Sequence, residues 1–384
     1  MTGGTSADLR YGVNPHQRAR VAPVGGSGWP LRVVSGEPSY LNLLDALTGW
    51  QLVSEAATVS GRVAAASVKH ASPAGVALDG PLDETATEVW RPPARPGAAT
   101  SAYLRARDAD PKSSFGDVIA VSAPVDAELA AVLRGLVSDV IIAPGYEAGA
   151  VRVLAAKKGG RFTVLEADPA FVPPARETRE VFGLRFEQDR DDAALDGWLP
   201  GARLPAAAAS DAVLGLAAVR YTQSNSVALM AGGMSLAVAA GQQNRVDCVR
   251  LAAAKAAIWW LRRHPAVRDL PVLPGQPRQD RLNWQIRLAA GELPGRQQAE
   301  FAALFPGTPM LTPDERASWL GQLTGLTLVS DGYLPFSDNI DEAARIGVRY
   351  VVEPGGSVRS DDVARACADY GITLVQTGLR LFRH

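Results

Sequence analysis

The chain has 384 residues, of which 47% are hydrophobic and 21% are charged, and its formal net charge is -1. This balance is typical of an ordinary globular protein and gives no general attraction to nucleic acid or to anionic membranes. No apolar run of about 18 residues is free of charges or of Gly and Pro breaks, and the N-terminus has no signal-peptide pattern. We therefore expect a cytoplasmic protein with neither nucleic-acid nor membrane partners.

Cysteine and histidine are too few to build a common metal site. The two cysteines, Cys248 and Cys367, exclude a disulfide framework, and we interpret both as buried small hydrophobic residues. Of the four histidines, His264 precedes a proline at the end of a helical stretch, and we interpret it as structural.

The N-terminal part of the chain begins with small polar residues. Residues 1–8 predict a disordered start. Residues 42–56 carry apolar side chains at helical spacing, so this stretch predicts a helix that packs against the strand that follows it.

Two titratable side chains, Lys69 and His70, stand where a predicted strand ends. Small and β-branched residues over 64–68 predict the strand, and Ser72-Pro73-Ala74-Gly75 predicts a sharp turn directly afterwards. An imidazole exchanges a proton near neutral pH, and an adjacent ammonium stabilises a developing anion. A surface Lys-His pair at a turn is the alternative interpretation.

The rest of the first half alternates between helix and strand. Residues 98–106 and 127–136 predict helices, and residues 118–122 and 140–143 predict strands. Between them, residues 113–117 form a turn whose hydroxyl groups and glycine suit close approach by a ligand, or a simple loop. The alternation predicts a mostly parallel sheet.

A stretch rich in Pro, Arg and Asp divides the chain into two halves. We interpret residues 171–205 as a joint between a first unit over 9–170 and a second unit over 206–384. Within the second unit, residues 269–313 are broken repeatedly by proline and glycine, which predicts a peripheral, partly helical insertion.

The second half repeats the alternation of helices and strands. In open α/β sheets, ligands collect outside the carboxyl ends of strands, so we expect a site there, with Lys69 and His70 at the same class of position. The glycine-led turn at 241–245 precedes a helix and resembles an anion site, but it does not fit a P-loop or a dinucleotide fingerprint. The predicted helices cover 210–219, 246–262, 338–346 and 360–370, and the predicted strands cover 227–230, 235–240, 326–330, 348–352 and 372–375.

Nine short segments occur in a fixed order along the chain. They are residues 9–17, 69–75, 113–117, 141–146, 221–227, 241–245, 330–336, 354–357 and 380–384. In this order they resemble the transformylase part of the bifunctional AICAR transformylase/IMP cyclohydrolase family, and the resemblance runs from about residue 9 to the last residue. The cyclohydrolase part that precedes this region in the family has no counterpart here, so the resemblance implies a stand-alone enzyme without ring-closing activity.

The resemblance also implies a fold and an assembly. The expected α/β fold has two cytidine-deaminase-like αβα subdomains, arranged as an intertwined homodimer whose active sites are shared between subunits. Zinc deaminases hold their metal with a Cys-x-x-Cys pair. Neither half of this sequence has that pair, so we expect no zinc.

The implied reaction moves a formyl group from 10-formyltetrahydrofolate to the 5-amino group of AICAR and gives FAICAR. By resemblance His70 is the base, and Lys69 stabilises the tetrahedral oxyanion or protonates the leaving folate nitrogen. Asn225 matches the residue that positions the formyl oxygen or the amine, although a core or turn asparagine is its alternative.

Other positions match ligand contacts in the family. Arg10 and Arg380 match phosphate ligands, and a guanidinium group suits a phosphate because it donates in a bidentate fork. Asp338 matches a residue near the folate and is equally placed to cap the following helix. The other nucleotide contacts are Tyr11, Gly116, Asp139, Arg245, Tyr333 and Phe382, and the other folate contacts are Val246, Asn283, Pro335 and Phe336.

A structural potassium ion is a further implication of the resemblance. Relatives bind it with oxygen atoms, and hydroxyl-rich turns without an ion are the alternative here. The matching positions are Thr222, Ser224, Ser226, Asp331 and Leu381.

Some residues depart from the family pattern and leave the amine substrate open. Tyr333 replaces a phenylalanine beside the nucleotide, Lys112 stands where an animal relative has methionine, and Ala237 and Ala239 occupy positions often held by glycine. The alternatives are a one-carbon transferase acting on a related amino-heterocycle and a non-catalytic nucleotide-binding homologue. An intact Lys69-His70 pair argues against the latter.

Overall fold

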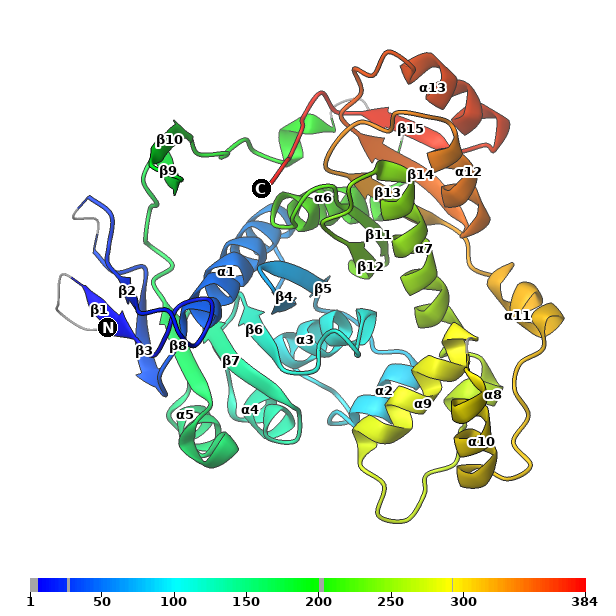
Figure 1. The fold of residues 1–384 in the computed structure, drawn as a ribbon, viewed down its shortest axis with the longest axis horizontal. Coiled ribbons are helices and arrows are strands. Elements are labelled where there is room, and N and C mark those ends of the chain that lie inside the picture. Colours follow the sequence, from blue (N-terminus) through cyan, green and yellow to red (C-terminus); the bar gives the residue numbers. More distant parts are fainter. Residues whose placement is uncertain (1–5, 26–27, 200–203, 292) are drawn as a thin grey trace.

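One large sheet runs through the whole molecule (Figure 1). The computed structural model describes residues 6–25, 28–199, 204–291 and 293–384. The strands of the large sheet are β3 (Leu31–Ser35), β4 (Ala64–Lys69), β5 (Ser72–Leu78), β6 (Asp117–Val121), β7 (Ser138–Ala143), β8 (Thr163–Ala167), β11 (Val227–Ala231), β12 (Met234–Ala239), β13 (Leu326–Ser330), β14 (Val348–Glu353) and β15 (Thr373–Gln376). Among the described residues these eleven strands lie in the order β15-β14-β13-β11-β12-β5-β4-β6-β7-β8-β3.

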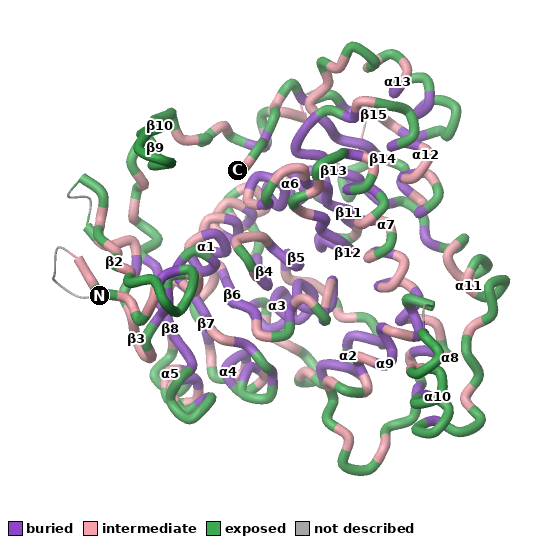
Figure 2. The backbone as a smooth tube through the Cα atoms, in the orientation of Figure 1, coloured by how far each residue is buried: buried purple, intermediate pink, exposed green. Residues whose placement is uncertain are grey.

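Helices cover both faces of this sheet. They are α1 (Tyr40–Ser60), α2 (Glu84–Trp90), α3 (Ala98–Ala109), α4 (Ala127–Arg134), α5 (Ala148–Ala155), α6 (Ala206–Arg220), α7 (Arg245–Leu261), α8 (Pro265–Arg268), α9 (Arg278–Ala290), α10 (Gly295–Leu304), α11 (Pro313–Leu320), α12 (Asp338–Arg345) and α13 (Ser360–Asp369), with short 3-10 turns η1 (Lys157–Gly160) and η2 (Asp196–Trp198). Alternate residues of β4 point to opposite faces, so Ala64 and Ala66 pack with α1 and α6 while Ala65 packs with α3. Figure 2 shows the central strands buried between these layers.

The prediction of a mostly parallel sheet is wrong. Parallel pairing is limited to β6-β7-β8 and β13-β14-β15, and every other pair of neighbours is antiparallel. The cause is that β4-β5 and β11-β12 are hairpins, and hydrophobic periodicity does not report strand direction.

The turn expected at residues 72–75 lies two residues earlier. Ser72–Leu78 is strand β5, and the chain reverses at His70 and Ala71, whose φ angles are 56° and 54°. Pro73 fits into β5 beside an irregularity in the register of the β4-β5 pair. The strand therefore delivers His70 into the hairpin turn itself.

The two halves of the sheet have the same topology. Each half runs helix, hairpin, helix and then three strands separated by helices, with strand orders β5-β4-β6-β7-β8 and β12-β11-β13-β14-β15. The halves join through β5 and β12, which are antiparallel. Corresponding hairpin turns therefore lie at opposite edges of the sheet.

A short sequence repeat accompanies this topology. The pattern Asp-Ala-x-x-Gly begins at Asp45 in α1 and at Asp211 in α6, at the sixth residue of each helix. A Cβ atom on Gly49 would lie 2.8 Å from the Cβ of Ala120, and one on Gly215 would lie 2.4 Å from a methyl group of Val329. Both helices thus approach the sheet too closely for any larger residue.

The N-terminal segment is more ordered than expected. Ala7–Leu9 forms strand β1, which pairs with β2 (Ala19–Val21), so residues 7 and 8 of the expected disordered start are structured. Residues 1–5 lie outside the described part of the chain.

The joint between the halves contains a hairpin that sequence periodicity did not predict. Strands β9 (Arg176–Val181) and β10 (Leu184–Asp189) pair with each other, and every residue in them is exposed. The hairpin stands away from the large sheet (Figure 1). Residues 200–203 of the joint lie outside the described residues.

The predicted insertion is helical and has its own small core. Leu261, Trp284, Phe301 and Phe305 pack together between α7, α9 and α10. Residue 292 of this region lies outside the residues that the structure describes. Over the described ranges, no helix combines the length and apolar character that crossing a membrane requires.

Candidate active site

Six of the predicted residues line one pocket of about 520 Å³. They are Arg10, Tyr11, Lys69, His70, Gly116 and Asp139. Because β4 is antiparallel to β6, the end of β4 adjoins the starts of β6, β7 and β8. The pocket therefore lies at the carboxyl end of β4, as expected for Lys69 and His70, and at the amino ends of the parallel strands β6, β7 and β8.

The two central side chains differ in exposure. Lys69 is half-buried, and its ammonium group donates a 2.8 Å hydrogen bond to the carbonyl oxygen of Phe115. His70 is exposed at the hairpin turn. The imidazole is thus open to a ligand in the pocket, while the ammonium is held next to Gly116.

A buried polar network fixes the floor of this region. The carboxylate of Asp117 accepts hydrogen bonds from Ser67 at 2.7 Å, from Tyr103 at 3.0 Å and from Arg107 at 2.9 Å. Burial raises the pKa of Asp117, and the neighbouring Arg107 guanidinium opposes that rise. Ser114, which we expected to face a ligand, instead turns its hydroxyl inward to Ser67. The network ties α3, β4 and β6 together directly behind Lys69.

Sequence reasoning missed four charged residues of the same pocket, Glu37, Asp45, Lys158 and Arg161. Lys158 forms an ion pair with Asp139, and the Arg161 side chain donates to the Lys158 carbonyl at 3.2 Å. The segment Lys-Lys-Gly-Gly-Arg over residues 157–161 is a basic, glycine-bearing turn that could have signalled an anion site.

A second group of predicted residues lies around Arg245. Its guanidinium donates to the side-chain oxygen of Asn225 at 2.9 Å and forms an ion pair with buried Asp331. A Cβ atom on Gly332 would lie 2.5 Å from the ring of Phe382 and 2.6 Å from the Arg245 guanidinium, so a larger residue would displace at least one of these side chains. These residues lie just before β11, at the start of α7, just after β13 and in the C-terminal segment.

Arg380 belongs to this second group through Phe382. Its guanidinium carbon lies 4.9 Å from the centroid of the Phe382 ring. Arg10 and Arg380, the two expected phosphate ligands, therefore belong to different groups within one chain.

Four of the five predicted potassium positions are connected. The Ser224 hydroxyl donates to the Asp331 carboxylate at 2.5 Å, the Asp331 amide donates to the Ser226 carbonyl at 3.2 Å, and the Leu381 amide donates to the Asp331 carbonyl at 2.9 Å. The fifth residue, Thr222, donates to a helix carbonyl instead. The hydroxyl of Ser226 is buried and has no hydrogen-bond partner among the described residues.

The β13-α12 loop carries two of the five expected folate residues, Pro335 and Phe336, and the expected nucleotide contact Tyr333. Tyr333 and Phe336 are exposed, and Pro335 is half-buried between them. Asp338 is the first residue of α12 and Ser337 is its cap, so the alternative assignment of Asp338 as the N-cap is wrong. Val246 follows Arg245 at the start of α7.

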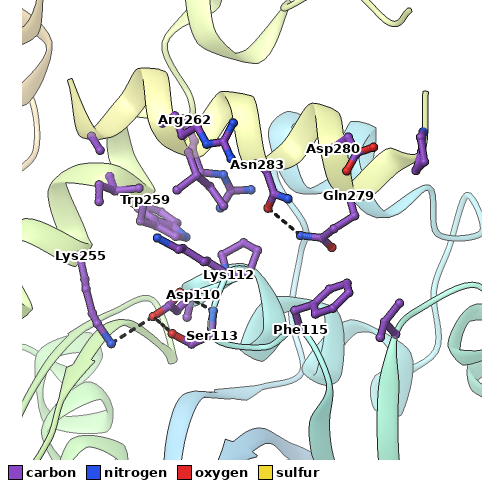
Figure 3. Close-up of a pocket in the computed structure, with 18 of the residues that line it drawn as sticks. Asp110, Lys112, Ser113, Phe115, Lys255, Trp259, Arg262, Gln279, Asp280 and Asn283 are labelled. Carbon is purple, nitrogen blue, oxygen red and sulfur yellow. Dashed lines mark hydrogen bonds and ion pairs between the residues drawn. The ribbon is translucent and has the colours of Figure 1, made fainter. Parts of the chain in front are cut away.

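Asn283 lies elsewhere, in a pocket of about 1270 Å³ between α3, α7 and α9 (Figure 3). Its side-chain oxygen accepts a 3.0 Å hydrogen bond from Gln279. Figure 3 shows Lys112 and Phe115 in the same pocket, with Trp259 along its wall. Phe115 immediately precedes Gly116, so this pocket adjoins the one that holds Lys69.

Three side chains that we interpreted as structural are so. Cys248 and Cys367 are buried and unpaired, and burial raises the pKa of each thiol to about 12. His264 caps α8 by accepting from the amide of Ala266 at 3.1 Å. Across the described ranges, no cluster of three or more His, Cys, Asp or Glu side chains is arranged to hold a metal ion.

Comparison with known proteins identifies the family. A family model described as AICARFT/IMPCHase bienzyme matches residues 1–255, which include Lys69, His70, Asn225 and Arg245. The chain belongs to this family. The resemblance inferred from the nine segments is thereby confirmed.

Curated relatives agree with this assignment. Two proteins named bifunctional purine biosynthesis protein PurH, from Dinoroseobacter shibae and Roseobacter denitrificans, are 31% and 32% identical to this chain over 394 residues. A third of the same name, from a Ruegeria species, is 30% identical over 392 residues. Each alignment covers 100% of this chain and 61% of the relative, so the chain spans about 61% of the length of these proteins.

Proposed function

We propose that this chain is a phosphoribosylaminoimidazolecarboxamide formyltransferase of purine biosynthesis, which transfers the formyl group of 10-formyltetrahydrofolate to the 5-amino group of AICAR. The observation that carries the proposal is the position of Lys69 and His70 at a pocket lined by further cations, in a member of this family. An amine-activating pair beside an anion site suits a phosphorylated amine.

The anionic end of the nucleotide lies against the basic side of the pocket. Arg10, Lys158 and Arg161 line it, and Arg10 is steadied by a 2.9 Å hydrogen bond from its guanidinium to the Tyr11 hydroxyl. Guanidinium groups bind phosphate with two parallel hydrogen bonds. Arg161 joins the proposed ligand set for this reason, although it was not predicted.

His70 accepts the proton of the 5-amino group as the amine nitrogen attacks the formyl carbon. The new C-N bond forms, the bond from the formyl carbon to the folate nitrogen breaks, and a proton from Lys69 or His70 is delivered to that nitrogen. The Lys69 ammonium, held by Phe115, also stabilises the oxyanion that forms on the way. General acid-base help of this kind contributes about a hundredfold to ten-thousandfold in rate.

The co-substrate 10-formyltetrahydrofolate occupies the large pocket that holds Asn283. Its volume of about 1270 Å³ admits a ligand of this size, and it adjoins the Lys69 pocket through Phe115. Val246, Pro335, Phe336 and Asp338 complete the folate contacts from a second subunit.

We infer a homodimer with shared sites because the second group of residues does not line the Lys69 pocket of its own chain. The two groups are neighbours at one end of the sheet, where the Gln223 amide donates to the Ser72 hydroxyl at 3.3 Å. In one chain Lys69 and His70 line the pocket at β4, whereas Asn225, Arg245 and Arg380 gather at β11 and the C-terminal segment. Two cytidine-deaminase-like subdomains are the assignment that the repeated topology supports.

The β9-β10 hairpin supports the same assembly. One of its faces carries ion pairs such as Arg176 with Glu187, while the other carries Val181, Leu184 and Phe186 without any cover. An isolated two-stranded hairpin is at best marginally stable in water, so a covering surface is required. Within the chain, Arg179, which lies opposite Phe186 on this face, donates to the carbonyl oxygen of His384. We infer that a second copy covers the apolar side chains of the face.

A potassium ion fits the oxygen-rich cluster at Asp331. The Ser226 hydroxyl, which has no hydrogen-bond partner among the described residues, the Ser224 hydroxyl and the Leu381 backbone offer hard oxygen donors of the kind such a cation prefers. The Arg245 guanidinium already donates to the Ser226 carbonyl and to Asp331 in this cluster. The ion would hold the C-terminal segment, and with it Phe382, against β13.

Turnover of AICAR with 10-formyltetrahydrofolate tests the proposal, with related aromatic amines as competitors. We expect AICAR to be the preferred acceptor and His70→Ala to abolish transfer while AICAR binding stays measurable. Failure to formylate AICAR at any concentration, or full activity of the His70→Ala variant, would overturn the proposal.

A further inference from the structure

Two buried aspartates occupy equivalent places in the two halves of the molecule. Asp45 in α1 accepts a 2.5 Å hydrogen bond from the amide of Ala71, in the β4-β5 turn. Asp211 in α6 accepts hydrogen bonds from the amides of Gly232 and Gly233, at 3.0 and 2.6 Å, in the β11-β12 turn. Burial raises the pKa of both carboxyl groups. The same arrangement therefore occurs twice in the fold: an aspartate in a helix accepts hydrogen bonds from the backbone amides of a hairpin turn.

The two turns have the same shape but different residues. Gly232 and Gly233 have φ angles of 61° and 77°, and His70 and Ala71 have φ angles of 56° and 54°. Glycine adopts this left-handed region freely, whereas residues with a Cβ atom pay a free-energy cost there. In the first half, His70 and Ala71 therefore adopt backbone angles that favour glycine. One of the two, His70, carries the imidazole.

Asp45 also lines the pocket that contains the imidazole of His70. It lines the pocket together with Lys69 and His70, and a positive charge on either of these side chains acts on its carboxylate electrostatically. The charged neighbour of Asp211 is instead Arg105, whose guanidinium also donates to the Gly232 carbonyl. The turn that Asp211 holds lies at the opposite edge of the sheet and consists of glycine. Of the two turns, only the one held by Asp45 therefore carries a reactive side chain, the imidazole of His70.

We propose that Asp45 is a positioning residue for the formyl transfer, whose carboxylate holds the strained His70-Ala71 turn so that the imidazole faces the amine of the bound substrate. This inference rests on the proposed function. The geometry of a reacting pair is exacting, since a displacement of about 1 Å can cost on the order of a hundredfold in rate. A turn released from Asp45 would leave substrate contacts at Arg10 and Arg161 in place while moving the base.

The test compares Asp45→Ala with Asp211→Ala, its matched control in the second half. We expect Asp45→Ala to lower kcat by about a hundredfold and to change the Kd for AICAR by less than about threefold. Both variants lose a buried carboxylate that holds a turn, so we expect Asp211→Ala to lower the melting temperature about as much as Asp45→Ala does. In contrast to Asp45→Ala, the Asp211→Ala variant should keep its kcat within about twofold of wild type. Equal kcat losses in the two variants, or a kcat of Asp45→Ala within about threefold of wild type, would overturn the proposal.

A second substitution separates positioning from a general loss of stability. Adding Ala71→Gly to Asp45→Ala removes the backbone strain, so we expect at least about tenfold of the lost kcat to return. No recovery in the double variant would contradict the role of the turn. If Asp45→Ala does not fold, Asp45→Asn replaces it, with an expected kcat loss of about tenfold because a neutral amide is a weaker acceptor; an unchanged kcat would contradict the proposal.

A structural readout keeps this inference distinct from the proposed function. Crystal structures of wild type and Asp45→Ala should show the φ angles of His70 and Ala71 changed in the variant. An inactive wild-type enzyme would defeat the proposed function alone, whereas an unchanged turn in the variant would defeat the role of Asp45 alone.

Discussion

The guanidinium group of Arg245 donates a 2.9 Å hydrogen bond to the side-chain oxygen of Asn225. This contact fixes the orientation of the amide, because its oxygen is occupied and its nitrogen is left as the donor. Of the two roles implied for Asn225, donation to the formyl oxygen is therefore the one that this geometry favours. Arg245 itself is buried and anchored by Asp331, so the amide is held by a rigid partner.

Replacing Asn225 by Asp should remove the donor and keep the fold. The carboxylate would pair with Arg245, so we expect little change in the melting temperature. Loss of one donor to a developing oxyanion costs about a hundredfold to a thousandfold in kcat. Steady-state kinetics and thermal unfolding of Asn225→Asp check this, and a kcat close to that of wild type would exclude the assigned role.

Arg161 should act on substrate binding rather than on the chemical step. Replacing it by Ser removes a guanidinium from the basic side of the pocket, so we expect the KM for AICAR to rise about tenfold or more with kcat nearly unchanged. Arg152→Ser, at an exposed position of α5, is the control because it removes the same charge outside the pocket lining. Equal effects of the two substitutions would mean that Arg161 acts only through net charge.

The uncovered face of the β9-β10 hairpin should hold the dimer together. Leu184 is 65% exposed and Phe186 is 56% exposed in the single chain, and both lie on the apolar face. A charge buried in an interface without a partner is strongly unfavourable, so Leu184→Asp should raise the dimer dissociation constant at least about tenfold. Sedimentation velocity measures this.

Thr178→Lys is the control for the hairpin, because Thr178 pairs with Glu187 on the ion-paired face. It should leave the dimer intact. A Leu184→Asp protein that sediments as wild type, at every concentration, would show that the second copy does not cover this face.

Local sequence patterns predicted most elements but not their directions. Apolar spacing over 42–56 predicted α1, and the apolar run over 227–230 predicted β11, since each signal lies within a few residues. Nothing local reports that β4 and β6 run antiparallel, and this pairing decides which strand ends surround Lys69. The parallel-sheet prediction failed at this point.

The sequence allowed a site residue to be predicted only where unusual residue types stand next to it in the chain. The Lys69-His70 pair and the segment around Asn225 stood out because several unusual residue types are adjacent. The left-handed turn at His70 and Ala71 was missed because neither residue favours a positive φ. Asp45 was missed as a lone acid inside a helix, although the repeat of Asp-Ala-x-x-Gly at Asp211 was present in the sequence.

Subunit complementation tests the central claim most directly, namely that Lys69 and His70 of one chain work with Asn225 and Arg245 of a second copy. The variants His70→Ala and Asn225→Ala should each be inactive alone. Mixed and allowed to exchange subunits, they should regain about a quarter of the wild-type activity, because half of the dimers are mixed and each mixed dimer has one intact shared site. A mixture that exchanges subunits but stays as inactive as its parents would contradict the account.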